Sequence, residues 1–195
     1  ATATAAAATA ATAGAGGQSA EETAALALHA ADTEASSTLV ASLGGDVPAA
    51  LRTAAACSVA PTSFGGAAPP VFVLSLDRAA QFTFLMGEHL DAYEGEVYCV
   101  LNSVFDEAGR LQVERCRAYV ELCATRPRLH LWLLPPLEPS GMAALRSSLL
   151  RRIAGRGAAI MCDDDARYFE RSVAEGGALR IARLTFAQLV ARLVA

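Results

Sequence analysis

The aspartates Asp163, Asp164 and Asp165 are the residues best placed for chemistry, because they come directly after an apolar run at residues 158–162. Asp77 ends another apolar run at residues 71–76. Carboxylates at the ends of strands can hold Mg²⁺ through hard oxygen ligands and bring it to a phosphate. Neighbouring residues cannot all face one pocket, so the working pairs would be Asp163 with Asp165, or Asp164 with Asp77. The alternative is a solvated turn whose carboxylates cap the next helix.

Arginine is the only strongly basic residue: lysine and arginine together number 16, and none is lysine. Schiff-base and P-loop lysine chemistry are therefore excluded. Residues 139–162 contain no acid before Asp163, but they contain four arginines that could contact an anion or an acidic partner: Arg146, Arg151, Arg152 and Arg156. On a helical wheel Arg151 and Arg152 point away from the apolar face. Arg146 falls within that face, where it must reach water, pair with a carboxylate or meet a partner.

Other catalytic signatures are missing from the sequence. The glycines do not have the spacing of a dinucleotide-binding or P-loop motif, and no GxSxG elbow is present. The histidines are His29, His89 and His130, and His130 alternates with leucines as a core residue of a strand would. We therefore expect no cofactor, except Mg²⁺ if the strand-end carboxylates form a metal site.

Charge and cysteine content restrict the partners and the compartment. The net charge of −4 comes from residues 1–70, and the rest of the chain is balanced, so nucleic-acid binding is not expected. The 5 cysteines are unclustered and lie mostly in apolar runs, which indicates free thiols in a reducing intracellular compartment. We recognise no signal peptide, transit peptide or membrane-spanning segment.

Short apolar runs alternate with segments of helical length after residue 70. The runs at residues 71–76, 96–101, 129–134, 158–162 and 178–183 predict buried strands. Capping residues and apolar periodicity predict helices after Pro139 and Thr185. The sequence therefore predicts a doubly wound, mostly parallel α/β sheet of five strands at residues 70–195. A flexible Ala/Thr-rich arm (1–18) and an Ala-rich helical leader and linker (19–69) precede this domain.

Residues 111–123 fit two structures. Val113, Cys116 and Val120 have helical spacing, which completes the alternation of strands and helices. The segment also fits the second arm of an antiparallel hairpin at 96–122, turned at residues 106–110. We favour the helix. A hairpin would make the sheet mixed and interrupt the shared carboxyl edge.

Two classes of function remain open. The apolar content, the lack of catalytic fingerprints and the long leader favour a non-catalytic assembly or protein–protein interaction subunit, with a protein partner or a second copy of itself. The absence of lysine and the frequent cysteine also suit a structural protein of a large DNA virus with a GC-rich genome. The alternative is an enzyme that uses Mg²⁺ and the strand-end carboxylates for phosphoryl transfer or phosphodiester cleavage.

Overall fold

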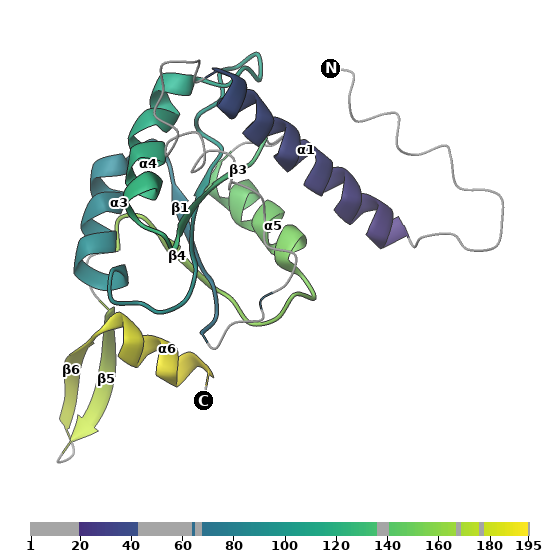
Figure 1. The fold of residues 1–195 in the computed structure, drawn as a ribbon. Helices are drawn as coiled ribbons and strands as arrows, with labels where there is room; N and C mark the ends of the chain where they lie inside the picture. The colour runs from purple at the N-terminus through teal and green to yellow at the C-terminus, as the bar shows by residue number, and fades with distance from the viewer. Residues whose placement is uncertain are drawn as a thin grey trace.

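The computed structural model describes residues 20–42, 64, 68–135, 141–166, 169–175 and 178–194. Within these ranges the chain forms a 4-stranded parallel sheet covered by helices and a separate antiparallel pair of strands (Figure 1). The predicted α/β fold class is confirmed.

The parallel sheet has the strand order β3-β2-β1-β4. Every residue of β1 and β2 is buried, because these central strands are covered on both faces. This burial explains the continuous apolar runs of the sequence. The strands have these bounds: β1 (Val71–Ser75), β2 (Val97–Leu101), β3 (Leu129–Leu133) and β4 (Ile160–Asp163).

Helices cover the two faces of the sheet. Val71 and Val73 pack on one face against α3 (Ala79–Leu85), the π-helix η1 (Met86–Leu90) that continues it, and α4 (Val113–Thr125). Phe72 and Leu74 pack on the other face against α5 (Met142–Ile153). The side chains of a strand alternate between faces, so neighbouring residues of β1 enter different cores.

The segment that fitted two structures is a helix. Residues 113–125 form α4, which places Cys116, Val120 and Cys123 in the core. The hairpin alternative at 96–122 is wrong, because β2 pairs in parallel with β1 and β3. The predicted turn does form, since Phe105 and Leu111 make an isolated antiparallel bridge, but the chain then enters the helix.

The predicted fifth strand forms, but its predicted place in the parallel sheet is wrong. Residues 178–184 form β6 (Ala178–Leu184), which pairs antiparallel with β5 (Phe169–Glu175) in a 2-stranded sheet. A helix between the last two strands was implied by the alternation, and β5 occupies most of that segment. Gly176 and Gly177 are the only residues between β5 and β6 in the sequence, and such a pair is a hairpin signal.

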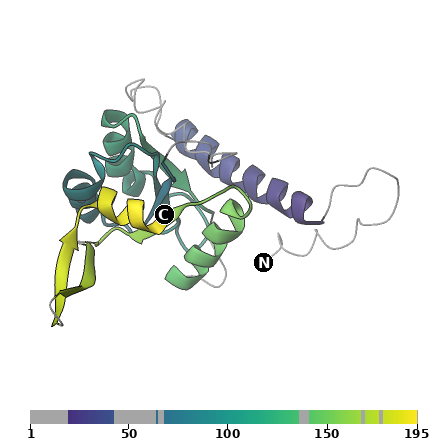
Figure 2. The same cartoon turned by 90° about the horizontal axis from the view of Figure 1, so that it is seen from below.

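The N-terminal helix lies within the predicted helical leader. It extends over α1 (Ala20–Ser42) and contacts β3 and α5. Its N-terminal half projects beyond the sheet and its helices (Figures 1 and 2). The predicted arm at 1–18 and residues 43–63 of the predicted leader and linker lie outside the described residues. The division of the chain into a leader and an α/β domain stays a prediction.

Candidate functional site

The carboxyl edge between β1 and β4 is the point where the strand order reverses. β2 and β3 lie on one side of β1, and β4 lies on its other side. Open α/β sheets bind ligands outside the strand ends at such a point. Asp164 donates its backbone N–H to the carbonyl of Leu74 at 3.1 Å, so the aspartate run lies beside the end of β1. This is the edge to which the sequence assigned the candidate carboxylates.

A series of buried and partly buried hydrogen bonds occupies this edge. The Arg78 backbone N–H donates to Tyr119 Oη at 2.7 Å, Tyr119 Oη lies 2.6 Å from Ser75 Oγ, and Ser75 Oγ donates to Asp164 Oδ2 at 2.5 Å. Since the Ser75 proton points to the carboxylate, Tyr119 donates to Ser75. All donors therefore run in one direction and end on Asp164. Ser75 and Asp164 are 0% exposed, so a substrate cannot reach either group.

Tyr119 is held in its neutral form. Burial raises the pKa of its hydroxyl, and the hydrogen bonds from the Arg78 backbone and with Ser75 only partly oppose this effect. A neutral tyrosine suits this series of hydrogen bonds, because the hydroxyl must both accept and donate. The series joins the end of β1, the start of α3, α4 and the turn after β4. These hydrogen bonds therefore hold the four segments together at the edge of the sheet.

Each of the four candidate aspartates is bound to an arginine. Arg78 pairs with the buried Asp164 and, at 3.2 Å, with Asp165. The Asp77 carboxylate lies 3.3 Å from Arg115 Nε, and Arg146 Nη2 donates to both oxygens of Asp163 at 2.8 and 2.6 Å. The partners are thus Arg78 for Asp164 and Asp165, Arg115 for Asp77, and Arg146 for Asp163.

These pairs change the chemistry expected at the edge. A carboxylate that accepts hydrogen bonds from a guanidinium has fewer lone pairs for a cation, and the positive charge repels one. Within the described ranges, no group of three or more His, Cys, Asp or Glu side chains is arranged to hold a metal ion. A magnesium ion would therefore have to displace Arg78 or Arg146.

The predicted arginine group does not form one surface. Arg146 binds Asp163, which is one of the outcomes expected for an arginine within the apolar face. Arg151 is exposed and Arg156 is partly buried. Arg152 is only 5% exposed, so its predicted solvent-facing position is wrong. The helical wheel failed there because α1 covers that side of α5.

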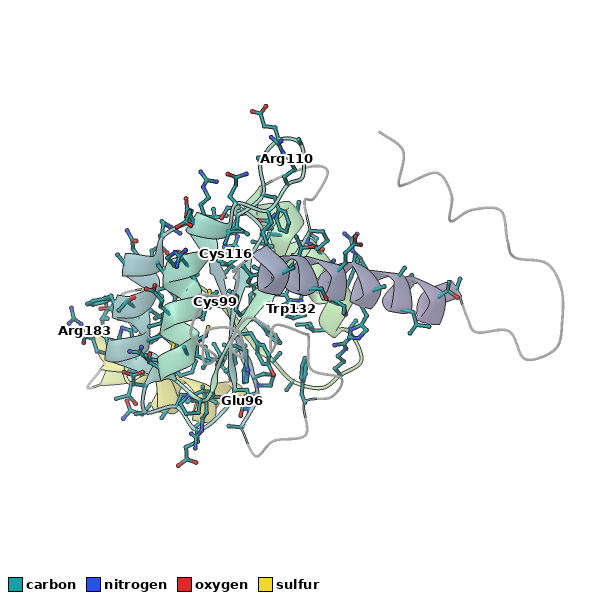
Figure 3. The ribbon with its side chains drawn as sticks, turned by 45° about the horizontal axis from the view of Figure 1, so that its top comes forward. Glu96, Cys99, Arg110, Cys116, Trp132 and Arg183 are labelled. Atoms are coloured by element: carbon teal, nitrogen blue, oxygen red, sulfur yellow. The ribbon has the colours of Figure 1, made fainter. Side chains whose placement is uncertain are left out.

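Arg152 belongs to a buried network that the sequence analysis missed. Its Nε and Nη2 atoms each donate at 2.9 Å to Asp32, which is 1% exposed. Trp132 donates its indole N–H to the same carboxylate at 3.2 Å, and Figure 3 shows Trp132 beside α1. Among the described side chains of α1, the buried ones are Asp32, Ala35 and Leu39, which share one helical face. An aspartate on the same helical face as the apolar Leu39 was the sequence signal that could have indicated this buried network.

The C-terminal hairpin and α6 (Phe186–Val194) dock on η1 through aromatic rings. The Phe186 ring lies 5.0 Å from Tyr93 and 5.4 Å from Phe169, and Phe169 lies 5.2 Å from His89. Thr185 and Gln188 exchange hydrogen bonds as the predicted capping box at the start of α6. A pocket of about 430 Å³ lies between η1 and α6, and Glu88, His89 and Arg183 contribute to its walls. None of the candidate aspartates lines this pocket.

Beyond this aromatic contact the hairpin extends away from the sheet and its helices (Figures 1 and 2). Each of its strands has 7 residues, whereas the strands of the parallel sheet have 4 or 5. In the part of the chain that the structure describes, no third strand pairs with either edge of the hairpin. Ile181 in β6 is 71% exposed, the highest value among the exposed large apolar residues described.

Comparison with known proteins gives no relative. No protein-family model, no curated protein and no solved structure matches this chain. None of the helices in the described ranges is long and apolar enough to cross a membrane.

Proposed function

We propose that this protein is a non-catalytic protein–protein interaction subunit of a larger assembly, and that the β5–β6 hairpin is its main contact element. The observation that carries this proposal is the projecting hairpin, whose two edges have no further strand among the described residues. Unpaired strand edges present backbone N–H and C=O groups that readily pair with a strand of another chain.

The hairpin has a physical need for such a partner. An isolated pair of strands is marginally stable in water, and independent stability generally requires a third strand or cover for an apolar face. Among the described side chains, the base of the hairpin is anchored through Phe169 against Phe186 and His89. Ile181 remains exposed in the middle of β6. A strand from another protein would complete the ribbon.

The carboxyl edge also supports a non-catalytic role. Its serine, tyrosine and aspartate satisfy one another, and Ser75 and Asp164 have no exposed surface. The free thiols of Cys99, Cys116 and Cys123 are buried as well, which suits a structural protein in a reducing compartment.

The Mg²⁺-dependent enzyme remains a separate hypothesis with its own test. A metal site that binds only the folded protein raises the melting temperature as the ion concentration rises. Mg²⁺ and Mn²⁺ should therefore be titrated into the wild-type protein and into Asp163→Asn, which removes an accessible carboxylate of the aspartate run. An upward shift in the wild type that the variant loses would favour the enzyme. We expect no shift in either protein.

The proposed function is tested by the size of the complexes that contain the protein in the cells that produce it. The full chain and the Ile181→Asp variant are compared by gel filtration of gentle lysates. The wild type should elute well above its chain mass of 20.2 kDa, and Ile181→Asp should elute at a smaller size. Leu150→Asp is the matched control, because Leu150 is 56% exposed on α5, away from the hairpin. Equal elution of all three proteins would contradict the proposal.

A further inference from the structure

We infer that the partner of the hairpin is a second copy of this chain, which pairs antiparallel with the outer edge of β5 and places Val173 opposite Val173. This inference rests on the proposed function, since it names the partner of the same hairpin. The two hairpins would form one four-stranded ribbon with a twofold axis, with a β6 strand at each side.

The charges of the two strands favour the β5 edge. β5 contains Glu170, Arg171 and Glu175, so it carries both signs. β6 contains Arg180 and Arg183 and no acid. Two β6 edges would therefore bring only positive charges together, whereas two β5 edges can place opposite charges across the new interface.

The register centred on Val173 produces this complementarity twice. An antiparallel pair with Val173 opposite itself places Arg171 of each copy opposite Glu175 of the other, because these residues lie two positions on either side of Val173. Opposite charges directly across a strand pair are stabilising, and like charges in the same positions are destabilising. The twofold symmetry doubles the effect of either arrangement.

In the hairpin's own register neither of these two positions lies opposite a charged residue. Within it, Arg171 lies opposite Ala182 and Glu175 lies opposite Ala178. By contrast, Glu170 lies opposite Arg183, and their side chains form an ion pair at 3.8 Å. Changing the sign at position 171 or 175 therefore alters no opposed charge pair of the hairpin. Arg180 lies opposite Val173 and is therefore a diagonal neighbour of both positions, so each single change also alters a charge relation within the hairpin. The double variant keeps one charge of each sign beside Arg180, and it therefore isolates the effect on pairing with a second copy.

The same register also continues a row of small and apolar residues across the ribbon. Ile181 lies opposite Ser172 in the hairpin, and Leu179 lies opposite Ala174. With Val173 on the twofold axis, Ser172 of one copy lies opposite Ala174 of the other. Ile181 and Ser172 of one copy then align with Ala174 and Leu179 of the second. A single hairpin has too few strands for independent stability, which generally needs three or more strands with an apolar face. A four-stranded ribbon with such a row meets this requirement.

Charge reversal in the purified full chain tests the inference. Arg171→Glu or Glu175→Arg alone replaces two attractive pairs by two like-charge pairs, whereas the double variant restores attraction with the signs exchanged. By light scattering after gel filtration, we expect the wild type and the double variant at twice the 20.2 kDa chain mass. Each single variant should raise the dimer dissociation constant roughly 10- to 100-fold. Arg117→Glu, an exposed arginine on α4, is the control with the same charge change.

The outcomes separate this inference from the proposed function. A wild type that stays monomeric at all concentrations, or single variants that dimerise as well as the wild type, would overturn pairing through β5. The proposed function would survive that result if Ile181→Asp still reduced the size of the complexes in lysates, because the partner would then be another protein. The purified chain could instead dimerise through β5 as inferred, while the lysate complexes did not depend on the hairpin. The proposed role in a larger assembly would then be rejected, and the dimer would stand.

Discussion

Removal of the Asp32 carboxylate should destabilise the protein strongly. Asp32→Ala leaves the Arg152 guanidinium, which is 5% exposed, without its bidentate partner, and the Trp132 N–H loses its acceptor. Breaking a buried ion pair by removing one partner costs about 3–5 kcal/mol. For a chain of this size, the corresponding fall in the melting temperature is roughly 6–20 °C.

Urea denaturation of the wild type and four variants would measure this effect. Arg152→Met removes the other charge and should also destabilise, whereas the double variant Asp32→Leu with Arg152→Met should lose less than either single variant, since no unpaired charge remains buried. Glu114→Ala breaks an exposed pair on α4 and should cost about 0.5 kcal/mol or less. A loss below about 1 kcal/mol for Asp32→Ala would refute the role of the network in holding α1.

Other consequences follow from the carboxyl edge and from the buried thiols. Asp164→Asn weakens two hydrogen bonds to a buried carboxylate and should lower the free energy of unfolding by about 1.5–3 kcal/mol in urea denaturation. An unchanged free energy would show that these hydrogen bonds do not stabilise the edge of the sheet. Tyr119→Phe removes the hydroxyl between Ser75 and Arg78 and should cost about 1–3 kcal/mol by the same assay. Burial raises the pKa of Cys116, Cys123 and Cys162 to about 12, so at pH 8 a thiol reagent should modify them far more slowly in the folded protein than in denaturant. Because these thiols ionise near pH 9 when unfolded and stay protonated when folded, stability should fall as pH rises above about 9, and a flat profile between pH 9 and 11 would contradict their burial.

The sequence was most informative where one element determines its own structure. Continuous apolar runs predicted β1 to β4, because strands buried on both faces tolerate few polar residues. The spacing of Cys116, Val120 and Cys123 predicted α4 correctly, although a turn before it imitated a hairpin. β6 was assigned to the wrong sheet, since an apolar run does not reveal its partner strand. The local Gly176-Gly177 signal before it was not used in the prediction.

The candidate site was predicted in position but not in its interactions. Strand ends brought Asp77 and the aspartate run to one edge, as the parallel topology requires. Their partners Arg78, Arg115 and Arg146 come from the loop after β1, from α4 and from α5, so each pair depends on how these elements pack. Asp32 and Arg152 are 120 positions apart, and no local pattern joins them.

Site-specific photo-crosslinking of the full chain in its own cells tests the central claim most directly, because it records what touches the hairpin. Probes would be placed at Val173 in β5, at Ile181 in β6 and at Arg110, a loop residue whose side chain is 79% exposed, as the control. We expect crosslinked protein from both hairpin positions and little from position 110, with the Val173 probe giving a dimer of this chain. Hairpin probes that crosslink no more than the control would contradict the account.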